Sequence, residues 1–145
     1  MICAFQDYEN LYMVLDYMPG GDLRYYMGQR KYLTEEEASN SLFILGFIIA
    51  CAVLGLEYMH TKGIMHRDVK PENLVVDKNG YICITDLGIA RVLSPDNGND
   101  TSGTPGYMAP EVIFRQNHGV AVDYFALGVL AYECMRGIVL FFMSA

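Results

Sequence analysis

Tryptophan is absent from this 145-residue chain, which has five prolines and ten Lys and Arg residues. Against the ten basic residues stand 17 acidic ones, so the formal net charge is −7. This acidic balance argues against a nucleic-acid backbone as the partner. It does not exclude a small anionic ligand, because metal ions bound with such a ligand dominate the local electric field. The length suits a single domain with its own core.

The chain also lacks any Cys-x-x-Cys pair, the spacing typical of zinc sites and redox motifs. Its four cysteines, Cys3, Cys51, Cys83 and Cys134, are therefore predicted to be buried free thiols in a reducing compartment, the cytoplasm or the nucleus. No charged segment followed by an apolar core opens the chain, so a secretory signal peptide is not expected.

Charged and strongly polar side chains are missing from residues 42–56. A helical membrane span needs about 20 apolar residues, so this run is short by more than a turn. We therefore expect a buried core helix and no membrane partner. The alternative, in which this run and the apolar tail 138–145 anchor the chain in a membrane, would be tested by fractionation without detergent.

Three motifs follow one another along the chain. They are His66-Arg67-Asp68-Val69-Lys70-Pro71-Glu72-Asn73-Leu74, then Asp86-Leu87-Gly88, then Gly103-Thr104-Pro105-Gly106-Tyr107-Met108-Ala109-Pro110-Glu111. In this order and spacing they resemble the catalytic loop, the metal-binding triplet and the Ala-Pro-Glu segment of eukaryotic protein kinases. A lysine two positions after the catalytic Asp is the serine/threonine-kinase pattern. The Pro-Gly-Gly-Asp of residues 19–22 resembles the AGC group of these kinases.

The resemblance implies an α+β fold, a partial kinase domain with a mostly helical large lobe and a short β-hairpin. Residues 1–18 would be a remnant of the small lobe with the hinge, and residues 19–145 a partial large lobe truncated after about residue 137. The glycine-rich loop, the lysine and the ion-pairing Glu of the small lobe have no match. We therefore expect negligible kinase activity from the chain as written. An incomplete gene model is the favoured explanation, and a catalytically inactive kinase-like binding module is the alternative.

Local patterns predict the elements that would position these motifs. Two strands should flank a turn at 6–10, a short helix capped by Asp22 should reach about Gln29, and a hairpin should span 74–85. A capping box at Thr34–Glu37 should open a helix that Gly63 ends, and an apolar helix should run from Asp123 to about Met135. By resemblance, Asp123 would brace the backbone of the catalytic loop.

The predicted long helix is about six residues longer than the resemblance leads us to expect, and the surplus falls in residues 39–47. Six residues rotate a helix by roughly 240°, which would turn the preceding apolar stripe away from the core. Either the helix bulges or overhangs there, or the gene model retains a stretch that is normally spliced out. We favour the second explanation.

Phosphoryl transfer depends on positioning and charge stabilisation, so the resemblance assigns each motif residue a role. Asp68 would accept the proton of the substrate hydroxyl, and Lys70 would neutralise the transferred phosphoryl group. Asn73 and Asp86 would hold Mg²⁺ through oxygen ligands, and Arg67 would bind an acidic group of the activation loop. Leu87 replaces the usual Phe and is expected to keep an apolar plug in the core.

The resemblance also implies an ATP site. Leu15 would be the gatekeeper behind the adenine, which would pair with the carbonyl of Asp16 and the N–H of Met18. The remaining nucleotide-binding positions by resemblance are Asp22, Glu72 and Val75. The carboxylates of Asp22 and Glu72 can meet ribose hydroxyls or basic side chains of a peptide. Our hypothesis is that protein substrates have Arg or Lys before the phosphoacceptor, with plain solubility as the competing explanation for these acids.

Residues 94–103 are polar and are expected to form a mobile loop without an apolar anchor. The activation-loop candidates in and after it are Asp100, Thr101, Ser102 and Thr104. Asp100 stands where AGC kinases commonly have a phosphorylated Thr. Either Asp100 gives Arg67 a constitutive negative charge, or an upstream kinase phosphorylates Thr101. We prefer Thr101, because a carboxylate has less charge and fewer acceptor oxygens than a phosphate.

Overall fold

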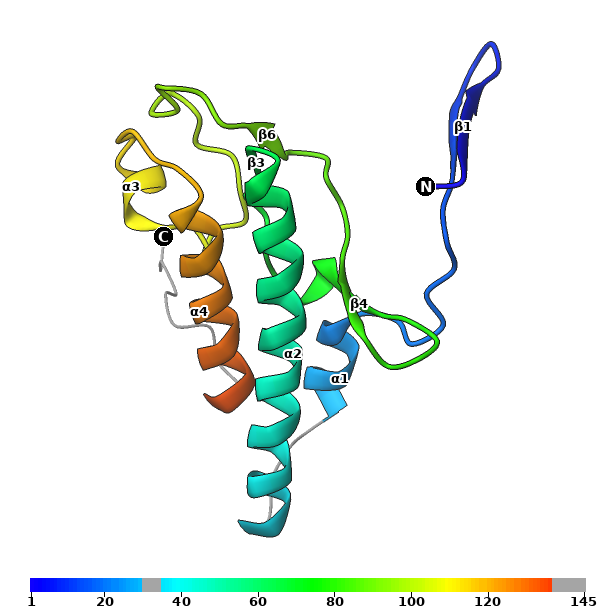
Figure 1. The fold of residues 1–145 in the computed structure, drawn as a ribbon, viewed down its shortest axis with the longest axis vertical. Coiled ribbons are helices and arrows are strands. Elements are labelled where there is room, and N and C mark those ends of the chain that lie inside the picture. Colours follow the sequence, from blue (N-terminus) through cyan, green and yellow to red (C-terminus); the bar gives the residue numbers. More distant parts are fainter. Residues whose placement is uncertain (30–34, 137–145) are drawn as a thin grey trace.

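The computed structural model describes residues 1–29 and 35–136, and it mixes helices with short strands (Figure 1). The helices are α1 (Leu23–Gln29), α2 (Glu35–Thr61), α3 (Pro110–Ile113) and α4 (Ala121–Arg136), with a 3₁₀ turn, η1 (Pro71–Asn73). The strands are β1 (Cys3–Gln6), β2 (Leu11–Val14), β3 (Ile64–Met65), β4 (Leu74–Val76), β5 (Ile82–Ile84) and β6 (Arg91–Val92). In the described part of the chain they form antiparallel pairs, β1 with β2, β3 with β6 and β4 with β5. The α+β class is confirmed.

The N-terminal hairpin of β1 and β2 stands apart from the helices in Figure 1. Its turn is stabilised by the carboxylate of Asp7, which accepts the N–H groups of Glu9 at 2.8 Å and Asn10 at 2.7 Å. All residues of both strands are exposed. The predicted strand, turn and second strand are confirmed.

Helix α1 begins after Asp22, whose carboxylate accepts the N–H of Tyr25 at 2.9 Å and so caps the first turn as predicted. Helix α2 ends where expected, because Gly63 adopts the left-handed conformation (φ 69°) and its N–H donates to the carbonyl of His60 at 2.9 Å. Thr34 of the predicted capping box and the apolar tail 138–145 lie outside the described residues.

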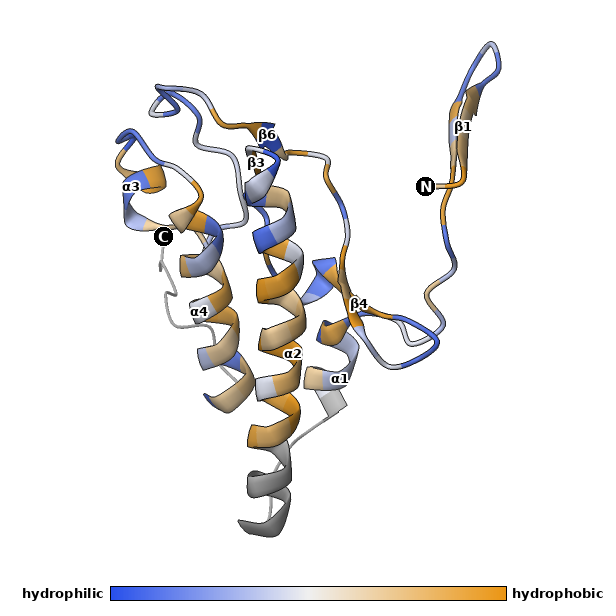
Figure 2. Cartoon of the chain, viewed as in Figure 1, coloured by the Kyte–Doolittle hydropathy of each residue, from blue (hydrophilic) through white to orange (hydrophobic). Residues whose placement is uncertain are grey.

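Helix α2 is continuous through residues 39–47, without the bulge that the sequence left open as one explanation (Figure 1). The prediction of a buried core helix over 42–56 is wrong for most of its length. Ala52 and Leu56 are buried, but Phe43 is 82% exposed and Leu54 is 65% exposed. The reason is that α4 and β5 pack against only part of the helix, and Figure 2 shows apolar residues along much of it.

By length and composition, Leu42–Thr61 could span a membrane, and 17% of its most apolar window is buried. Core helices of soluble proteins reach the same length and composition. The stretch is thus longer than the 15 residues that the sequence pattern singled out.

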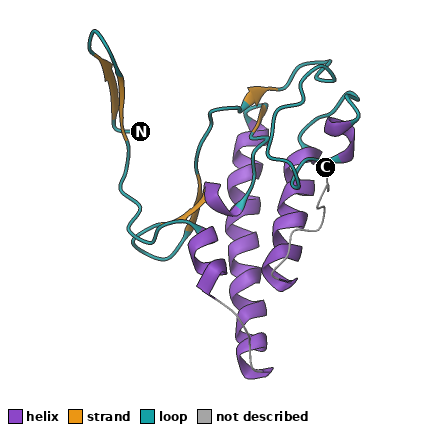
Figure 3. Cartoon of the chain, turned by 180° about the vertical axis from the view of Figure 1, so that it is seen from behind, coloured by secondary structure: helices purple, strands orange, loops and turns teal. Residues whose placement is uncertain are grey.

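The core lies where α2 and α4 meet β4, β5 and the catalytic-loop region. Leu56, Leu74 and Leu130 are fully buried there, and Val69 joins them from the loop. Seen from behind in Figure 3, α1, α2 and α4 lie side by side, and most of the longer loops gather at one end of the bundle. The helices therefore support the loops that contain the motifs.

The β4–β5 hairpin is confirmed, with Leu74 opposite Ile84 and Val76 opposite Ile82. Its turn is held by the Asp77 carboxylate, which accepts the N–H of Asn79 at 2.8 Å, and by Gly80 at φ 87°. The four cysteines are free, but Cys3 is exposed and the others are half-buried, so the prediction of buried thiols is wrong. They lie on strands and helix faces that remain open to solvent.

Candidate catalytic site

The carboxylate of Asp68 is the centre of a polar cluster made by the catalytic loop and Thr104. Its Oδ2 lies 2.7 Å from Nζ of Lys70 and 3.0 Å from Nδ2 of Asn73, which donates to it. Its Oδ1 accepts the hydroxyl of Thr104 at 2.5 Å, and Lys70 also donates to that hydroxyl oxygen at 2.8 Å. The structure thus brings four of the sequence-predicted residues, Asp68, Lys70, Asn73 and Thr104, into direct contact.

This environment keeps Asp68 ionised. Burial by itself would raise the pKa of Asp68, but the hydrogen bonds from Lys70 and Thr104 outweigh that effect and lower the pKa below its ordinary value. At neutral pH, Asp68 is therefore a carboxylate with accepting oxygens directed at hydroxyl and ammonium donors. Such a group can orient an incoming hydroxyl and take its proton late in a transfer reaction.

The backbone around Asp68 is held in place from α4. Asp123 is fully buried in the first turn of α4, and its carboxylate accepts the N–H of His66 at 2.9 Å and of Arg67 at 2.7 Å. Arg67 is a non-glycine residue with φ 69°, a conformation that costs free energy and persists only when neighbours enforce it. The predicted bracing role of Asp123 is confirmed in this geometry.

His66 connects the catalytic loop to the segment that contains Asp86. Its Nδ1 accepts the N–H of Asp68 at 3.2 Å, which leaves Nε2 to donate to the carbonyl of Thr85 at 3.0 Å. The buried imidazole therefore uses both ring nitrogens in a single tautomer. A second tie is the N–H of Thr85, which donates to the carbonyl of Asn73 at 2.9 Å.

Asn73 and Asp86 have the donor chemistry that a magnesium site requires. Asn73 donates through Nδ2, so its Oδ1 is the atom that can coordinate a cation. Asp86 is exposed, with φ 62°, and its Oδ1 accepts the N–H of Gly88 at 3.1 Å. One amide oxygen and one open carboxylate fit Mg²⁺, which usually takes only one or two protein ligands beside water and phosphate.

Leu87 does not fill the core. The prediction that it keeps an apolar plug is wrong, because its side chain is 59% exposed. It follows Asp86, whose left-handed backbone turns the chain at this point.

The residues predicted to bind ATP fall into two groups. Asp22 and Val75 are brought together by a β-bridge, with the N–H of Val76 donating to the carbonyl of Gly21 at 2.9 Å. Asp16 and Met18 lie in the extended segment before α1, where the Asp16 carboxylate is 3.8 Å from the amino group of Met1. Leu15, the predicted gatekeeper, is exposed in the same segment.

Glu72 belongs to a cluster that the sequence did not reveal. Nε of Arg24 lies 2.8 Å from Glu72, Nη1 lies 2.6 Å from Glu133, and Nη2 donates to the Tyr107 hydroxyl at 2.7 Å. Burial alone would lower the pKa of Arg24, but its hydrogen bonds to Glu133 and Glu72 raise it. For Tyr107, burial and Glu133 both raise the pKa. The partners are 48 to 109 residues apart, so no local motif could have signalled the cluster.

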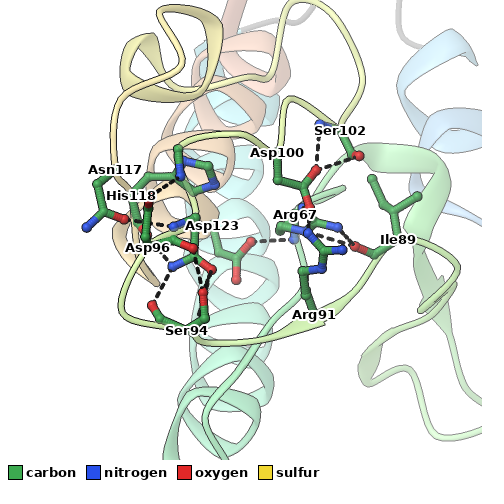
Figure 4. Close-up of polar contacts among 12 residues, drawn as sticks. Arg67, Ile89, Arg91, Ser94, Asp96, Asp100, Ser102, Asn117, His118 and Asp123 are labelled. Atoms are coloured by element: carbon green, nitrogen blue, oxygen red, sulfur yellow. Dashed lines mark hydrogen bonds and ion pairs between the residues drawn. The ribbon is translucent and has the colours of Figure 1, made fainter.

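Among the activation-loop candidates, Asp100 and not Thr101 contacts Arg67. The Asp100 carboxylate forms ion pairs with Arg67 and Arg91, as Figure 4 shows. It also accepts the Ser102 hydroxyl at 2.8 Å, while Thr101 is exposed. Burial of Asp100 by itself would raise its pKa, but the hydrogen bonds from Ser102 and Arg67 lower the pKa from 3.8 to about 2.

The polar loop 94–103 has an anchor after all, and it is polar. Asn97 is buried, its N–H donates to the Asn117 side chain at 2.9 Å, and its Nδ2 donates to the carbonyl of His118 at 3.0 Å. No local sequence pattern signals this anchor, because the partners lie 20 and 21 residues further along the chain. An apolar side chain is not needed, since the buried amide is fully hydrogen-bonded.

In the comparison with known proteins, the matching family and the relatives described below are all protein kinases. The family described as protein kinase domain matches residues 1–145. The cAMP-dependent protein kinase catalytic subunit PRKX of Homo sapiens is 43% identical over 139 residues, which cover 96% of this chain and 37% of that protein. The cAMP-dependent protein kinase type 3 of Saccharomyces cerevisiae is 40% identical over 141 residues, 97% of this chain and 33% of that protein. Protein kinase 2 of Dictyostelium discoideum is 39% identical over 136 residues, 93% and 27% respectively. The chain thus spans between about a quarter and two fifths of the length of these relatives.

Proposed function

The chain belongs to the protein kinase family, and from this premise we propose that it serves the transfer of the γ-phosphate of ATP to serine and threonine hydroxyls of proteins. The observation that supports the proposal most strongly is the Asp68 cluster. There an ionised carboxylate accepts a threonine hydroxyl at 2.5 Å beside the ammonium group of Lys70. A substrate hydroxyl would need the same kind of acceptor.

In the proposed mechanism Asp68 orients the substrate hydroxyl and takes its proton as the oxygen–phosphorus bond forms and the bond to the leaving ADP breaks. Lys70 offsets the negative charge of the transferred phosphoryl group. Bound Mg²⁺ would neutralise the phosphates of ATP, with Asn73 and Asp86 as its oxygen ligands. Asp123 acts through the backbone, because it fixes the strained Arg67 that precedes Asp68.

The nucleotide contacts remain part of this proposal. Asp16 and Met18 would pair with the adenine through backbone groups, and Val75 would line the adenine site. Asp22 and Glu72 would face the ribose or the peptide. The proximity of Asp22 and Val75 supports a shared site for these two.

We also propose that protein substrates with Arg or Lys before the phosphoacceptor are preferred. The support is Glu72, which already accepts a guanidinium, that of Arg24. A substrate side chain would have to compete with Arg24, so we expect a moderate preference. A peptide array that shows no enrichment of basic residues would remove this part of the proposal.

The decisive experiment is transfer of labelled γ-phosphate from Mg²⁺-ATP to a serine/threonine peptide library, compared between the wild type and two variants. The chain alone is expected to transfer phosphate only weakly, because the glycine-rich loop and the lysine have no match in it, and Asp68→Asn, which removes the charge of the proposed base, should abolish that transfer. The matched control is Asp96→Asn, an exposed loop acid whose carboxylate accepts the N–H of Gly98, and it should match the wild type. Wild-type transfer that does not exceed the transfer by Asp68→Asn would remove the support for a catalytic Asp68 in this chain and would favour the inactive binding module.

A further inference from the structure

Asp100 occupies a position at which an acid reaches two arginines at once. Its Oδ2 contacts the guanidinium groups of Arg67 and Arg91, and its Oδ1 accepts the N–H of Ser102 at 3.2 Å and the hydroxyl at 2.8 Å. Only 12% of the Asp100 side chain is exposed. Both oxygens of the carboxylate are therefore engaged, and no further donor is needed to satisfy them.

Through Arg67 this contact reaches the catalytic loop. Nε of Arg67 donates to the carbonyl of Ile89 at 2.8 Å, so one guanidinium ties residues 89 and 100 to the residue that precedes Asp68 (Figure 4). Arg91 comes from β6, where it is paired with Met65 of β3. The carboxylate of Asp100 thus connects its own segment to the catalytic loop at Arg67 and to β6 at Arg91.

The segment 94–103 is also held in place by the hydrogen bonds of Asn97, three residues before Asp100. Besides its bonds to Asn117 and His118, Asn97 donates to the carbonyl of Ser94 at 2.8 Å and accepts the hydroxyl of Ser94 at 2.9 Å. Thr101 follows Asn97 and precedes Thr104 in the chain. It is exposed, and its side chain takes no part in the hydrogen bonds described for this segment. The order of the segment therefore comes from unmodified side chains.

We propose that Asp100 is a positioning residue that holds Arg67, and through it the catalytic loop, in the place that a phosphorylated residue would otherwise fill. The activation segment would then be ordered without an upstream kinase. This inference rests on the proposed function of the Asp68 site. It replaces the preference for Thr101 that the sequence suggested, which compared a lone carboxylate with a phosphate.

The charge balance explains why a carboxylate suffices here. Two guanidinium groups and one carboxylate leave a net charge of +1 in the cluster, and the two Ser102 donors add to the stabilisation of the anion. Because the pKa of Asp100 is lowered in the folded chain, the contribution of Asp100 to stability depends on pH in one direction. Its contribution is complete above the ordinary carboxyl value of 3.8 and is lost as the pH falls toward 2. The charge of a phosphate group, with a second pKa near 6, would instead change between about pH 5 and 7.

The test is hydrogen–deuterium exchange of the full chain after phosphatase treatment. In the wild type we expect protected amides in residues 89–104 and 66–68, unchanged between pH 5 and 8 after correction for intrinsic exchange rates. Asp100→Asn should speed exchange in both stretches by about tenfold. Asp100→Glu should restore most of the protection, and the control Asp96→Asn should match the wild type.

Several outcomes would overturn the inference: Asp100→Asn exchanging as slowly as the wild type, Asp100→Glu failing to rescue, or a wild-type segment that gains protection only when Thr101 is phosphorylated. If Asp100→Asn does not fold, Thr101→Ala decides, because it should keep full protection and a loss would refute the role of Asp100. The proposed function is judged separately. Where the wild type transfers phosphate, Asp100→Asn should lower kcat and leave the KM for ATP nearly unchanged. Where it does not, the exchange data still test Asp100.

Discussion

At the scale of single residues, Asp123 does the most to shape the candidate site. It is fully buried, yet its carboxylate receives donors from two backbone N–H groups, of His66 and Arg67, and from Nε2 of His60 at 2.7 Å. A buried carboxylate is tolerated only when its oxygens are satisfied in this way. Asp123 lies in the first turn of α4, which begins at Ala121. The positive N-terminal end of the helix dipole therefore also stabilises its carboxylate.

Asp123→Ala should therefore be strongly destabilising. It leaves two N–H groups of the catalytic loop without their acceptor, and each buried unsatisfied donor costs about 1–3 kcal/mol. We expect the free energy of unfolding to fall by about 3 kcal/mol or more, measured by urea denaturation followed by circular dichroism. Asp123→Asn keeps one acceptor oxygen and should lose less. An equal loss in Asp123→Ala and in the exposed control Asp96→Ala would contradict this account.

At the scale of elements, two glycines, one near the middle of α2 and one just past its C-terminal end, should respond to the same substitution with opposite signs. Gly46 lies inside the helix and Gly63 lies just past its end at φ 69°, and a β-carbon added at either position would meet open space. Sterics therefore do not separate the two positions. Backbone conformation does, because alanine favours the helix interior and disfavours the left-handed region.

Gly46→Ala should raise the free energy of unfolding by about 0.5–1 kcal/mol, since glycine is that much worse than alanine inside a helix. Gly63→Ala should lower it by about 1 kcal/mol, because the left-handed conformation is strained for alanine. Thermal and urea denaturation of both variants would measure this. Two shifts of the same sign would show that α2 does not end as described.

The same scale shows what the sequence could predict. The β4–β5 hairpin, the stop at Gly63 and the cap at Asp22 were predictable because each depends on neighbours within a few residues. Asp68, Lys70 and Asn73 were predictable because their spacing matches a family motif, and the fold brings them together. Arg24, Glu133 and Asn97 were missed, because their partners are chosen by packing between distant segments. The exposure of α2 was missed because apolar composition alone does not say which neighbours a helix has.

At the scale of the whole molecule, the exposed side of α2 departs from the surface of a typical soluble globular protein. Phe43, Phe47, Leu54 and Tyr58 follow one another at spacings of four, seven and four residues, which places them along one helical face. All four are exposed, with Phe43 at 82% and Tyr58 at 67%. Contiguous apolar patches of this kind favour association in water, whereas single exposed apolar residues do not.

We expect the purified chain to self-associate through this face at micromolar concentrations and physiological salt. The double variant Phe43→Glu/Leu54→Glu should shift the sedimentation-velocity distribution toward the monomer, with the helix content in circular dichroism unchanged because glutamate is a good helix former. The control Asn99→Glu/Gln116→Glu adds the same two negative charges at exposed polar positions. If the control disperses the chain equally well, net charge and not the apolar face governs association. If neither variant changes the distribution, contacts elsewhere hold the molecules together, and the α2 face has no part in them.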